Sequence, residues 1–385
     1  MQKKSIKKKL AFVVSSPMTI EVFLLPHIKF LLSEFDITVF ANFAATDKEL
    51  RVRNLDVTVV PIRIERNISL LRDILGLIQL VKYFYTGKYT IVHSVSPKAG
   101  LLAALAGLLA GVPFRFHTFT GQVWANKQGA TRYFFQLLDK LMGMLVTRAL
   151  VDSSSQRKFL IDRSVLSNSN SVVLGDGSIC GVDAQRFSPN VEHTSKIRRC
   201  LGVGPGAVVI TFVGRFKREK GIIDLVDAFS DIAANLEDVY LVLVGPDEEG
   251  LVSEIETSVP NLMHKIHITN YTDRPEEYMC ASDIFVLPSY REGFGSTVIE
   301  AAACGVPAVV SDIYGLEDAI VPDVTGLVFR TGSANDLASK ISILITDKPF
   351  RMRLGEQAMF RARTLFSSSV LCKELFQFYK REMGN

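Results

Sequence analysis

The stretch PSYREGFGSTVIEAAACGV, residues 288–306, decides the fold of this chain. The run before it, IFVL at 284–287, is wholly apolar and stops at Pro288, which is typical of a buried parallel strand. Gly293 to Ser296 then form a turn that opens a helix. A strand, a glycine turn and a helix start leave backbone N–H groups unpaired at the positive end of a helix dipole. The stretch therefore predicts a site for a phosphate or another anion in an α/β fold.

Two glutamates, Glu292 and Glu300, lie eight residues apart on either side of this turn. Glu292 is expected in the loop and Glu300 one helical turn beyond Ser296, so both carboxylates can accept hydrogen bonds from the hydroxyls of a ligand. A turn that offers N–H donors to phosphate and carboxylates to hydroxyls suits a nucleotide sugar. Taken alone, two glutamates at this spacing are more often a surface loop acid and a helix acid stabilised by the helix dipole. The interpretation therefore depends on the other motifs in the chain.

A second turn of the same kind follows the apolar run Val208–Val213. Its residues, RFKREKG from Arg215 to Gly221, precede an amphipathic segment at 222–233 that predicts a helix. In a doubly wound sheet, ligands bind outside the carboxyl ends of the strands, where both turns are expected. The planar fork of Arg215 and the point charge of Lys220 are suited to a diphosphate at that edge.

The composition is that of a soluble protein with two or three domains. Of the 385 residues, 48% are hydrophobic and 22% are charged. The five cysteines have no C-x-x-C spacing, which favours reduced, mostly buried thiols in a cytosolic protein. The apolar run after the N-terminal lysines is too short for a secretory signal, and the run at 100–112 is shorter than the roughly 20 residues that a membrane span needs. We therefore expect a cytoplasmic protein that does not span a membrane.

Charge is divided unevenly along the chain. Residues 1–190 carry 24 Lys and Arg against 13 Asp and Glu, a net of +11, whereas residues 191–385 carry 20 against 27, a net of −7. A basic first half favours an anionic membrane surface or a diphosphate-linked acceptor. Dispersed solvated charge is the alternative. We expect no nucleic-acid partner, because no helix-turn-helix, zinc-finger or aromatic RNA-binding pattern is present.

Short apolar runs alternate with helix-length amphipathic segments, which predicts an α/β fold with covered parallel sheets. The expected strands of the first half are residues 11–15, 37–40, 57–61, 91–94, 114–118 and 149–152, with a short strand at 172–174. The expected strands of the second half are residues 208–213, 240–244, 266–269, 284–287, 308–311 and 327–329. The clearest helices are expected at 68–85, 99–110 and 131–147. Two Rossmann-like domains with a cleft between them follow from this pattern.

With both turns placed, the chain resembles the retaining glycosyltransferases of the GT-B fold, of the E-x7-E family 4 type, found in bacterial envelope polysaccharide synthesis. Phe212 to Arg215 with Lys220 looks like the family's donor-phosphate motif, and Glu292 to Glu300 looks like its E-x7-E motif. The resemblance covers nearly the full length. It implies an acceptor-side domain at 1–186, a nucleotide-sugar-binding domain at 187–365, and a C-terminal helix within 366–385 that packs back towards the first domain.

The resemblance also implies roles for the site residues. Arg215 and Lys220 would bind the donor diphosphate, Glu300 the ribose and Glu292 the hydroxyls of the transferred sugar. The turn would hold sugar and phosphate through Gly293, Phe294, Gly295, Ser296, Thr297 and Val298.

His117 comes directly after Phe114–Phe116 of an expected strand and looks like the family's histidine that contacts the donor sugar. A lone histidine at a strand end is otherwise more often structural. The chain departs from the family at Ser15 to Ile20, where many members carry a Gly-Gly that faces the donor phosphate and the acceptor. The geometry of the acceptor therefore stays open.

The mechanism implied is transfer with retention, in which the acceptor attacks from the same face and the leaving phosphate takes its proton. His117, Arg215, Lys220 and Glu292 would be the catalytic residues, and no protein nucleophile is needed. The sequence has no D-x-D, so we expect no metal and no cofactor besides the donor substrate. The donor is expected to be a UDP-linked hexose or N-acetylhexosamine, and the acceptor a lipid-diphosphate-linked saccharide at the inner face of the plasma membrane, where the enzyme would associate peripherally.

Three other readings remain. A nucleotide-sugar epimerase or a phosphorylase can share a twin Rossmann architecture, but the first needs acid and base groups in the cleft and the second a lysine-bound pyridoxal cofactor. A catalytically silent subunit that binds nucleotide sugar is the non-enzymatic alternative, against which the intact set of Arg215, Lys220, Glu292 and Glu300 argues. An oxidoreductase is disfavoured because no G-x-G-x-x-G follows the first strand.

Overall fold

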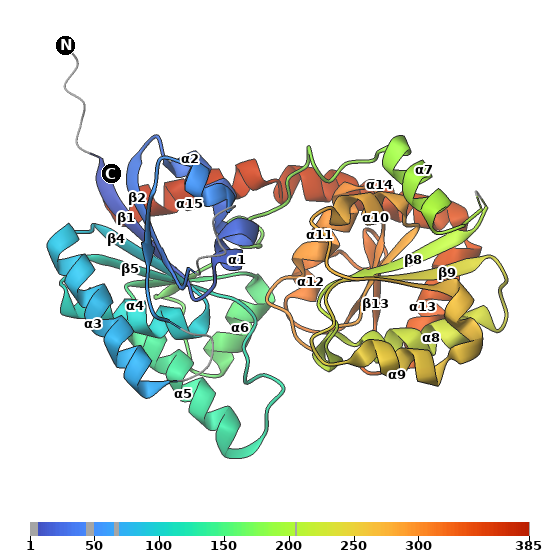
Figure 1. Cartoon of the computed structure of the whole chain (residues 1–385), viewed down its shortest axis with the longest axis horizontal. Helices are drawn as coiled ribbons and strands as arrows, with labels where there is room; N and C mark the ends of the chain where they lie inside the picture. Colours follow the sequence, from blue (N-terminus) through green and yellow to red (C-terminus); the bar gives the residue numbers. More distant parts are fainter. Residues whose placement is uncertain (1–6, 44–49, 65–68, 205, 385) are drawn as a thin grey trace, which may run out of the picture. The chain divides into compact units, whose positions relative to one another are not determined.

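The computed structural model describes residues 7–43, 50–64, 69–204 and 206–384. The chain divides into two compact units, shown in Figure 1. The first unit comprises Met1–Cys180 together with Ser369–Asn385, and the second comprises Gly181–Ser368. Lys3 and Lys4 of the basic N-terminus lie outside the described residues. No helix among the residues that the structure describes is long and apolar enough to cross a membrane.

The first unit is built on a parallel sheet of seven strands in the order β3-β2-β1-β4-β5-β6-β7. The chain starts in the middle of the sheet, builds outward to β3, and returns to build the other half from β4, which is the doubly wound arrangement. The strands are β1 (Lys8–Val13), β2 (Phe35–Ala41), β3 (Thr58–Pro61), β4 (Ile91–Val95), β5 (Phe114–Phe119), β6 (Arg148–Val151) and β7 (Ser171–Val172).

Helices cover both faces of this sheet. The connections from β3 through β6 all advance in one direction, so their right-handed crossovers place α3 (Leu70–Gly87), α4 (Pro97–Leu109) and α5 (Gly129–Leu145) in one layer. The opposite face is covered by α2 (Leu25–Leu31) and by the C-terminal helix α15 (Ser368–Glu382), which share one apolar core with β1 and β2. The shorter helices are α1 (Pro17–Thr19), η1 (Ile20–Leu24), η3 (Arg51–Asn54) and α6 (Ser154–Asp162).

The second unit has a parallel sheet of six strands in the order β10-β9-β8-β11-β12-β13. Its strands are β8 (Val208–Val213), β9 (Val239–Val244), β10 (Ile266–Thr269), β11 (Ile284–Leu287), β12 (Ala308–Ser311) and β13 (Gly326–Phe329). Its helices are α7 (Val191–Cys200), η4 (Arg218–Lys220), α8 (Ile222–Ala233), α9 (Leu251–Ser258), η5 (Pro260–Lys265), α10 (Pro275–Ala281), α11 (Ser296–Ala303), α12 (Leu316–Ala319), α13 (Ala334–Thr346) and α14 (Lys348–Leu365).

The expected fold class is confirmed: each unit is a parallel α/β sheet covered by helices, and every expected strand is present. The ends of β8, β10, β11 and β12 are those expected from the sequence, because each strand is a short apolar run bounded by polar or turn residues. The central strands β8 and β11 pair in parallel, with Ile210 opposite Ile284. The two turns that follow them therefore lie at the same edge of the sheet.

The chain passes between the units at Cys180–Gly181 and again at Ser368–Ser369. The outgoing and returning segments are paired within the second unit, where Val182 N donates to Phe366 O at 2.7 Å and Ser368 N donates to Val182 O at 2.9 Å. The ends expected from the sequence, after residues 186 and 365, lie a few residues away. This pairing between residues distant in sequence determines where the chain passes from one unit to the other, and composition does not reveal it.

Candidate functional site

The turn after β11 leads into α11 as the sequence predicts. Gly295 is the N-cap of α11 in the left-handed conformation, with φ of 73°, and among the described residues no side chain caps this end. Phe294 is buried and its ring packs against that of Phe366 at 5.1 Å between centroids, which anchors the turn. Ser296 and Thr297 are half-buried at the start of the helix. The arrangement presents the N-terminal N–H groups and two hydroxyls of α11 at the edge of the sheet.

The turn after β8 is held against the end of β11 by a close backbone contact. Gly221 has φ of 68°, and a Cβ atom at this position would lie 2.0 Å from the carbonyl oxygen of Pro288. Only glycine allows the approach. Tyr290 N also donates to the carbonyl oxygen of Glu219 at 2.9 Å. The two turns expected from the sequence are therefore in direct contact, although they are widely separated along the chain.

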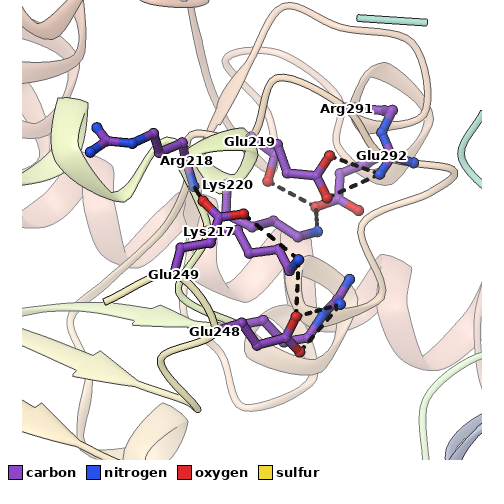
Figure 2. A network of polar contacts seen from close by, with 10 residues as sticks. Lys217, Arg218, Glu219, Lys220, Glu248, Glu249, Arg291 and Glu292 are labelled. Carbon is purple, nitrogen blue, oxygen red and sulfur yellow. Dashed lines mark hydrogen bonds and ion pairs between the residues drawn. The ribbon is translucent and has the colours of Figure 1, made fainter. Parts of the chain in front are cut away.

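This contact brings Lys220 and Glu292 together. Lys220 Nζ lies 2.5 Å from Glu292 Oε1, and the side chains of both residues are 16% exposed. Ser289 Oγ donates to the same carboxylate oxygen at 2.8 Å. Figure 2 shows this ion pair at the centre of a network of alternating charges. Glu292 is thus fixed by two donors, and the cation expected to meet phosphate lies beside the carboxylate expected to meet sugar.

Arg215, the second expected cation, is paired with an acid that the sequence analysis did not single out. Its Nη1 lies 3.2 Å from Glu248 Oε2, and Lys217 Nζ lies 3.0 Å from the same oxygen. Burial alone would raise the pKa of Glu248, but the hydrogen bond from Lys217 and the charges of Arg215 and Lys217 outweigh it and lower this pKa. The sequence contains a feature that could have predicted this pair: the acidic segment PDEEG at 246–250 follows β9, which is the neighbour of β8 in the sheet.

A further ion pair, also absent from the sequence analysis, ties the two turns together. Arg291 Nη2 lies 2.9 and 3.0 Å from the two carboxylate oxygens of Glu219 (Figure 2). Burial would raise the pKa of Glu219, yet the hydrogen bond and charge of Arg291, with the charge of Lys220, lower it. Glu219 therefore stays ionised between the two cations. This pair holds the backbone beside Lys220 and Glu292 in place.

Glu300 lies in α11 with its side chain half-buried. Burial raises the pKa of its carboxyl to about 7, the charge of Glu276 adds to this effect, and the charge of Arg186 opposes it. Arg186 is itself paired with Glu276 at 2.8 Å. Within the described residues, the Glu300 carboxylate accepts no hydrogen bond, so its oxygens are available to a ligand. With this pKa, the Glu300 carboxyl is present in both its neutral and its ionised form near pH 7, and either form can accept a hydrogen bond from a hydroxyl group.

His117 belongs to the first unit, whereas the other candidate residues belong to the second. It lies near the end of β5 and is only 1% exposed, with Nδ1 2.9 Å from Ser94 Oγ. Its ring packs so closely on α4 that a Cβ atom at Gly100 would lie 2.4 Å from it. Burial lowers the pKa of His117 to about 3, although the hydrogen bond with Ser94 opposes the shift. His117 is therefore a neutral, immobilised imidazole at physiological pH.

No group of three or more His, Cys, Asp or Glu side chains within the described ranges is placed to hold a metal ion. None of the five cysteines, all of which lie in the described ranges, forms a disulfide; Cys180, Cys304 and Cys372 are buried, Cys280 is half-buried and Cys200 is exposed.

Two family models match the chain, one for each half. The glycosyl transferase 4-like domain matches residues 33–177, and the glycosyl transferases group 1 domain matches residues 194–359. The second match contains both turns, with Arg215, Lys220, Glu292 and Glu300. The chain therefore belongs to the GT-B glycosyltransferases of family 4 type, as its sequence resemblance implied.

Relatives and solved structures agree with this assignment. The chain is 29% identical over 339 residues to the capsular polysaccharide biosynthesis glycosyltransferase CapM of Staphylococcus aureus, covering 86% of this chain and 87% of the relative. It is also 29% identical over 285 residues to the UDP-Gal:alpha-D-GlcNAc-diphosphoundecaprenol alpha-1,3-galactosyltransferase of Escherichia coli, covering 73% and 72%. The crystal structure of HepE from Anabaena in complex with UDP superposes with a TM-score of 0.81 at 19% identity, over 97% of this chain and 100% of that one, which supports the fold.

Proposed function

We propose that this protein is a retaining glycosyltransferase that moves a hexose or an N-acetylhexosamine from a UDP-linked donor to a lipid-diphosphate-linked saccharide in the synthesis of a cell-surface polysaccharide. The observation that carries the proposal is the contact between the two turns, which joins Lys220 to Glu292 at the carboxyl ends of β8 and β11. The relatives support the chemistry, since one is named for capsular polysaccharide and another for a UDP-galactose donor and a diphosphoundecaprenol acceptor.

The donor diphosphate would bind between the two turns. It would take Arg215 and Lys220 as cations and the N–H groups at the start of α11 as hydrogen-bond donors. In the structure these two cations are held by Glu248 and Glu292, so each is already positioned before the donor arrives. Positioning of this kind lowers the reorganisation needed when charge develops on the leaving group.

The sugar and the ribose would be held by the two glutamates. Glu292, fixed by Lys220 and Ser289, would accept hydrogen bonds from the sugar hydroxyls, and Glu300 from the ribose. Gly293, Phe294, Gly295, Ser296, Thr297 and Val298 would line the donor through backbone and hydroxyl groups. His117, held as a neutral imidazole, would contact the donor sugar.

The transfer step breaks the bond between the anomeric carbon and the diphosphate oxygen and forms a bond from the same carbon to the acceptor oxygen. The proton of the acceptor hydroxyl passes to the leaving phosphate, so the protein supplies neither nucleophile nor base. Arg215 and Lys220 stabilise the charge that develops on the diphosphate. These cations perform the role that a bridging metal would otherwise have, and the reaction is proposed to need no metal and no cofactor.

Lipid-linked acceptors lie in membranes, so we propose that the enzyme works in the cytoplasm as a peripheral protein of the inner face of the plasma membrane. The net charge of +11 in residues 1–190 supports an anionic surface as a partner.

A screen of nucleotide sugars tests the proposal. Purified protein is mixed with each donor, and thermal stability, release of free nucleotide and transfer to a synthetic lipid-diphosphate disaccharide are measured by mass spectrometry. Stabilisation by one UDP-sugar and a product heavier by one sugar are expected. A new isomer of the donor formed without acceptor would favour a nucleotide-sugar epimerase, and binding without any turnover would favour a silent subunit. If no nucleotide sugar binds, the proposal is refuted.

A further inference from the structure

Three helices of the first unit present an apolar outer surface that the fold does not require. They are α3, α4 and α5, which lie side by side in one layer with α4 packed against both neighbours (Figure 1). We call their outward side the α3–α5 surface. Its large exposed apolar side chains are Leu70, Leu71, Ile74, Leu75, Ile78, Tyr85, Leu108, Leu109, Tyr133, Phe134, Leu137, Leu141 and Met144. Soluble monomers rarely gather so many on one face.

Helix α3 is apolar on two faces, but only one of them packs into the core of the unit. Leu80 and Phe84 are buried in the core that α3 shares with the sheet and α4, and Gly76 is buried against Arg63 and Ile64. Leu71 and Ile78, seven residues apart and therefore on one outward face, are 78% and 59% exposed. An ordinary surface helix places polar residues on that face. The exposed stripe of α3 therefore indicates a contact outside the unit.

Helix α5 repeats the pattern. Asp139, Met142 and Gly143 face inward and are buried. Leu137 and Met144 again stand seven residues apart and are 60% and 66% exposed. Two separate helices of one layer thus carry the same kind of stripe.

The charges on these helices have one outward sign. Arg72, Lys82 and Lys140 are exposed, whereas of the two acids one is paired with a lysine and the other is buried. Asp73 pairs with Lys98 at 2.5 Å, and Asp139 is buried and accepts a hydrogen bond from Trp124 Nε1 at 2.7 Å. Apolar stripes flanked only by outward basic groups are complementary to an anionic lipid interface.

We propose that the α3–α5 surface docks the enzyme on an anionic bilayer, with α3 and α5 lying along the headgroup boundary. The inference rests on the proposed function in that a lipid-linked acceptor is found at such a surface. Tyrosines at positions 85 and 133 suit that boundary, because their rings are apolar and their hydroxyls remain in water. A second copy of this chain fits less well, since a two-fold contact through this surface would bring like charges together.

Vesicle co-sedimentation tests the docking surface without any nucleotide or acceptor. The vesicles contain 70% phosphatidylcholine and 30% phosphatidylglycerol, and neutral phosphatidylcholine vesicles are the comparison. The variants are L71E/I78E on α3 and L137E/M144E on α5. The matched control is M352E/F360E, which changes two exposed apolar residues of α14 in the second unit by the same charge.

The wild type and the α14 control are expected to bind the anionic vesicles. Each α3 or α5 variant is expected to bind them with an affinity lower by roughly tenfold or more. Serine variants at the same positions should also weaken binding, because they remove apolar area without adding charge. Equal binding by the wild type and both surface variants overturns the proposal. So does an equal loss in the α14 control. Sedimentation velocity without lipid adds one more outcome. If the wild type is a dimer and both surface variants are monomers, the surface is assigned to a second copy of the chain and the lipid assignment is overturned.

Transfer assays separate this inference from the proposed function. The surface variants should transfer sugar to a short-chain, water-soluble lipid-diphosphate acceptor as the wild type does, and should lose transfer to the same saccharide on a long-chain lipid in vesicles. Equal losses with both acceptors would place the stripes in the active machinery and overturn a docking role. If the protein transfers no sugar at all, the proposed function fails while the vesicle measurement still decides the docking surface.

Discussion

Lys220 Nζ and Glu292 Oε1 lie 2.5 Å apart and join two turns that are 72 residues distant in sequence. A cation suited to phosphate and a carboxylate suited to sugar hydroxyls thereby act as one unit. Each is the other's partner in the free protein, so removal of either leaves a half-buried charge uncompensated.

Lys220→Ala should lower kcat/KM for sugar transfer by roughly a hundredfold to a thousandfold, the scale for loss of one preorganised contact to transition-state charge. Arg215→Ala is expected to act in the same direction. Steady-state kinetics with the donor that the nucleotide-sugar screen selects measure both effects. Arg218→Ala is the matched control, since Arg218 lies in the same turn but pairs with Glu254 and is 64% exposed. If Arg218→Ala is as damaging as Lys220→Ala, the turn tolerates no change and the assignment of Lys220 to the diphosphate loses its support.

Glu300→Gln should weaken UDP binding about tenfold to a hundredfold, because a charge-assisted hydrogen bond to the ribose is lost. Titration calorimetry at several pH values measures this loss. The pKa of Glu300 is raised to about 7, and a ribose hydroxyl favours the ionised carboxylate. The affinity of the wild type should therefore rise more between about pH 6 and about pH 8 than that of Glu300→Gln, in which only the phosphate of UDP titrates. A variant that binds UDP like the wild type at every pH makes Glu300 structural.

The same titration affects stability. The pKa of Glu300 in the folded protein, about 7, lies above the ordinary value of 4.5 expected in the unfolded chain. Its contribution to stability is therefore complete below the unfolded value and is lost as pH rises through about 7. Urea unfolding of the wild type and Glu300→Gln should show a smaller loss of stability with pH in the variant. Parallel pH profiles for the two proteins would contradict the raised pKa.

Gly221→Ala should destabilise the second unit by roughly 1–3 kcal/mol more than a control at a positive φ without neighbours. The Cβ atom would lie 2.0 Å from Pro288 O and would force the two turns apart. Gly250→Ala is the control, because its φ of 72° is similar and no atom lies within 4 Å of its Cβ position. Urea unfolding measures both. Equal losses of stability would mean that only backbone strain, and not the contact between turns, matters at residue 221.

Transfer is expected to retain the anomeric configuration and to continue in excess chelator. Proton NMR of the product gives the configuration, and initial rates with and without EDTA test the metal requirement. Strict dependence on magnesium or manganese would contradict the role given to Arg215 and Lys220. An inverted product would contradict same-face attack.

Most of the fold was predictable from the sequence because its signals are local. The strands Val208–Val213 and Ile284–Leu287 are apolar runs that end at turn residues, and the turns after them contain their own glycines and charges. The expected residues Lys220 and Glu292 are brought together because β8 and β11 are neighbours in the sheet.

What the sequence did not reveal depends on contacts across the fold. Glu248 pairs with Arg215 only because β9 lies beside β8, and the burial of His117 depends on Gly100 of α4. A helix at 68–85 was expected from the sequence, but its outward apolar stripe was not identified, because the sequence alone does not tell which face of a helix is covered. Only the layer of α3, α4 and α5 shows which face is left uncovered.

The placement of α15 has a consequence for the order in which the protein forms during synthesis. Its buried residues Leu371, Leu375 and Tyr379 complete the apolar core beneath β1 and β2, and the Tyr379 hydroxyl lies 2.5 Å from His93 Nδ1 of β4. These residues leave the ribosome after the whole of Gly181–Ser368. The second unit can therefore fold while the first still lacks part of its core, and the half of the chain made first is the half finished last.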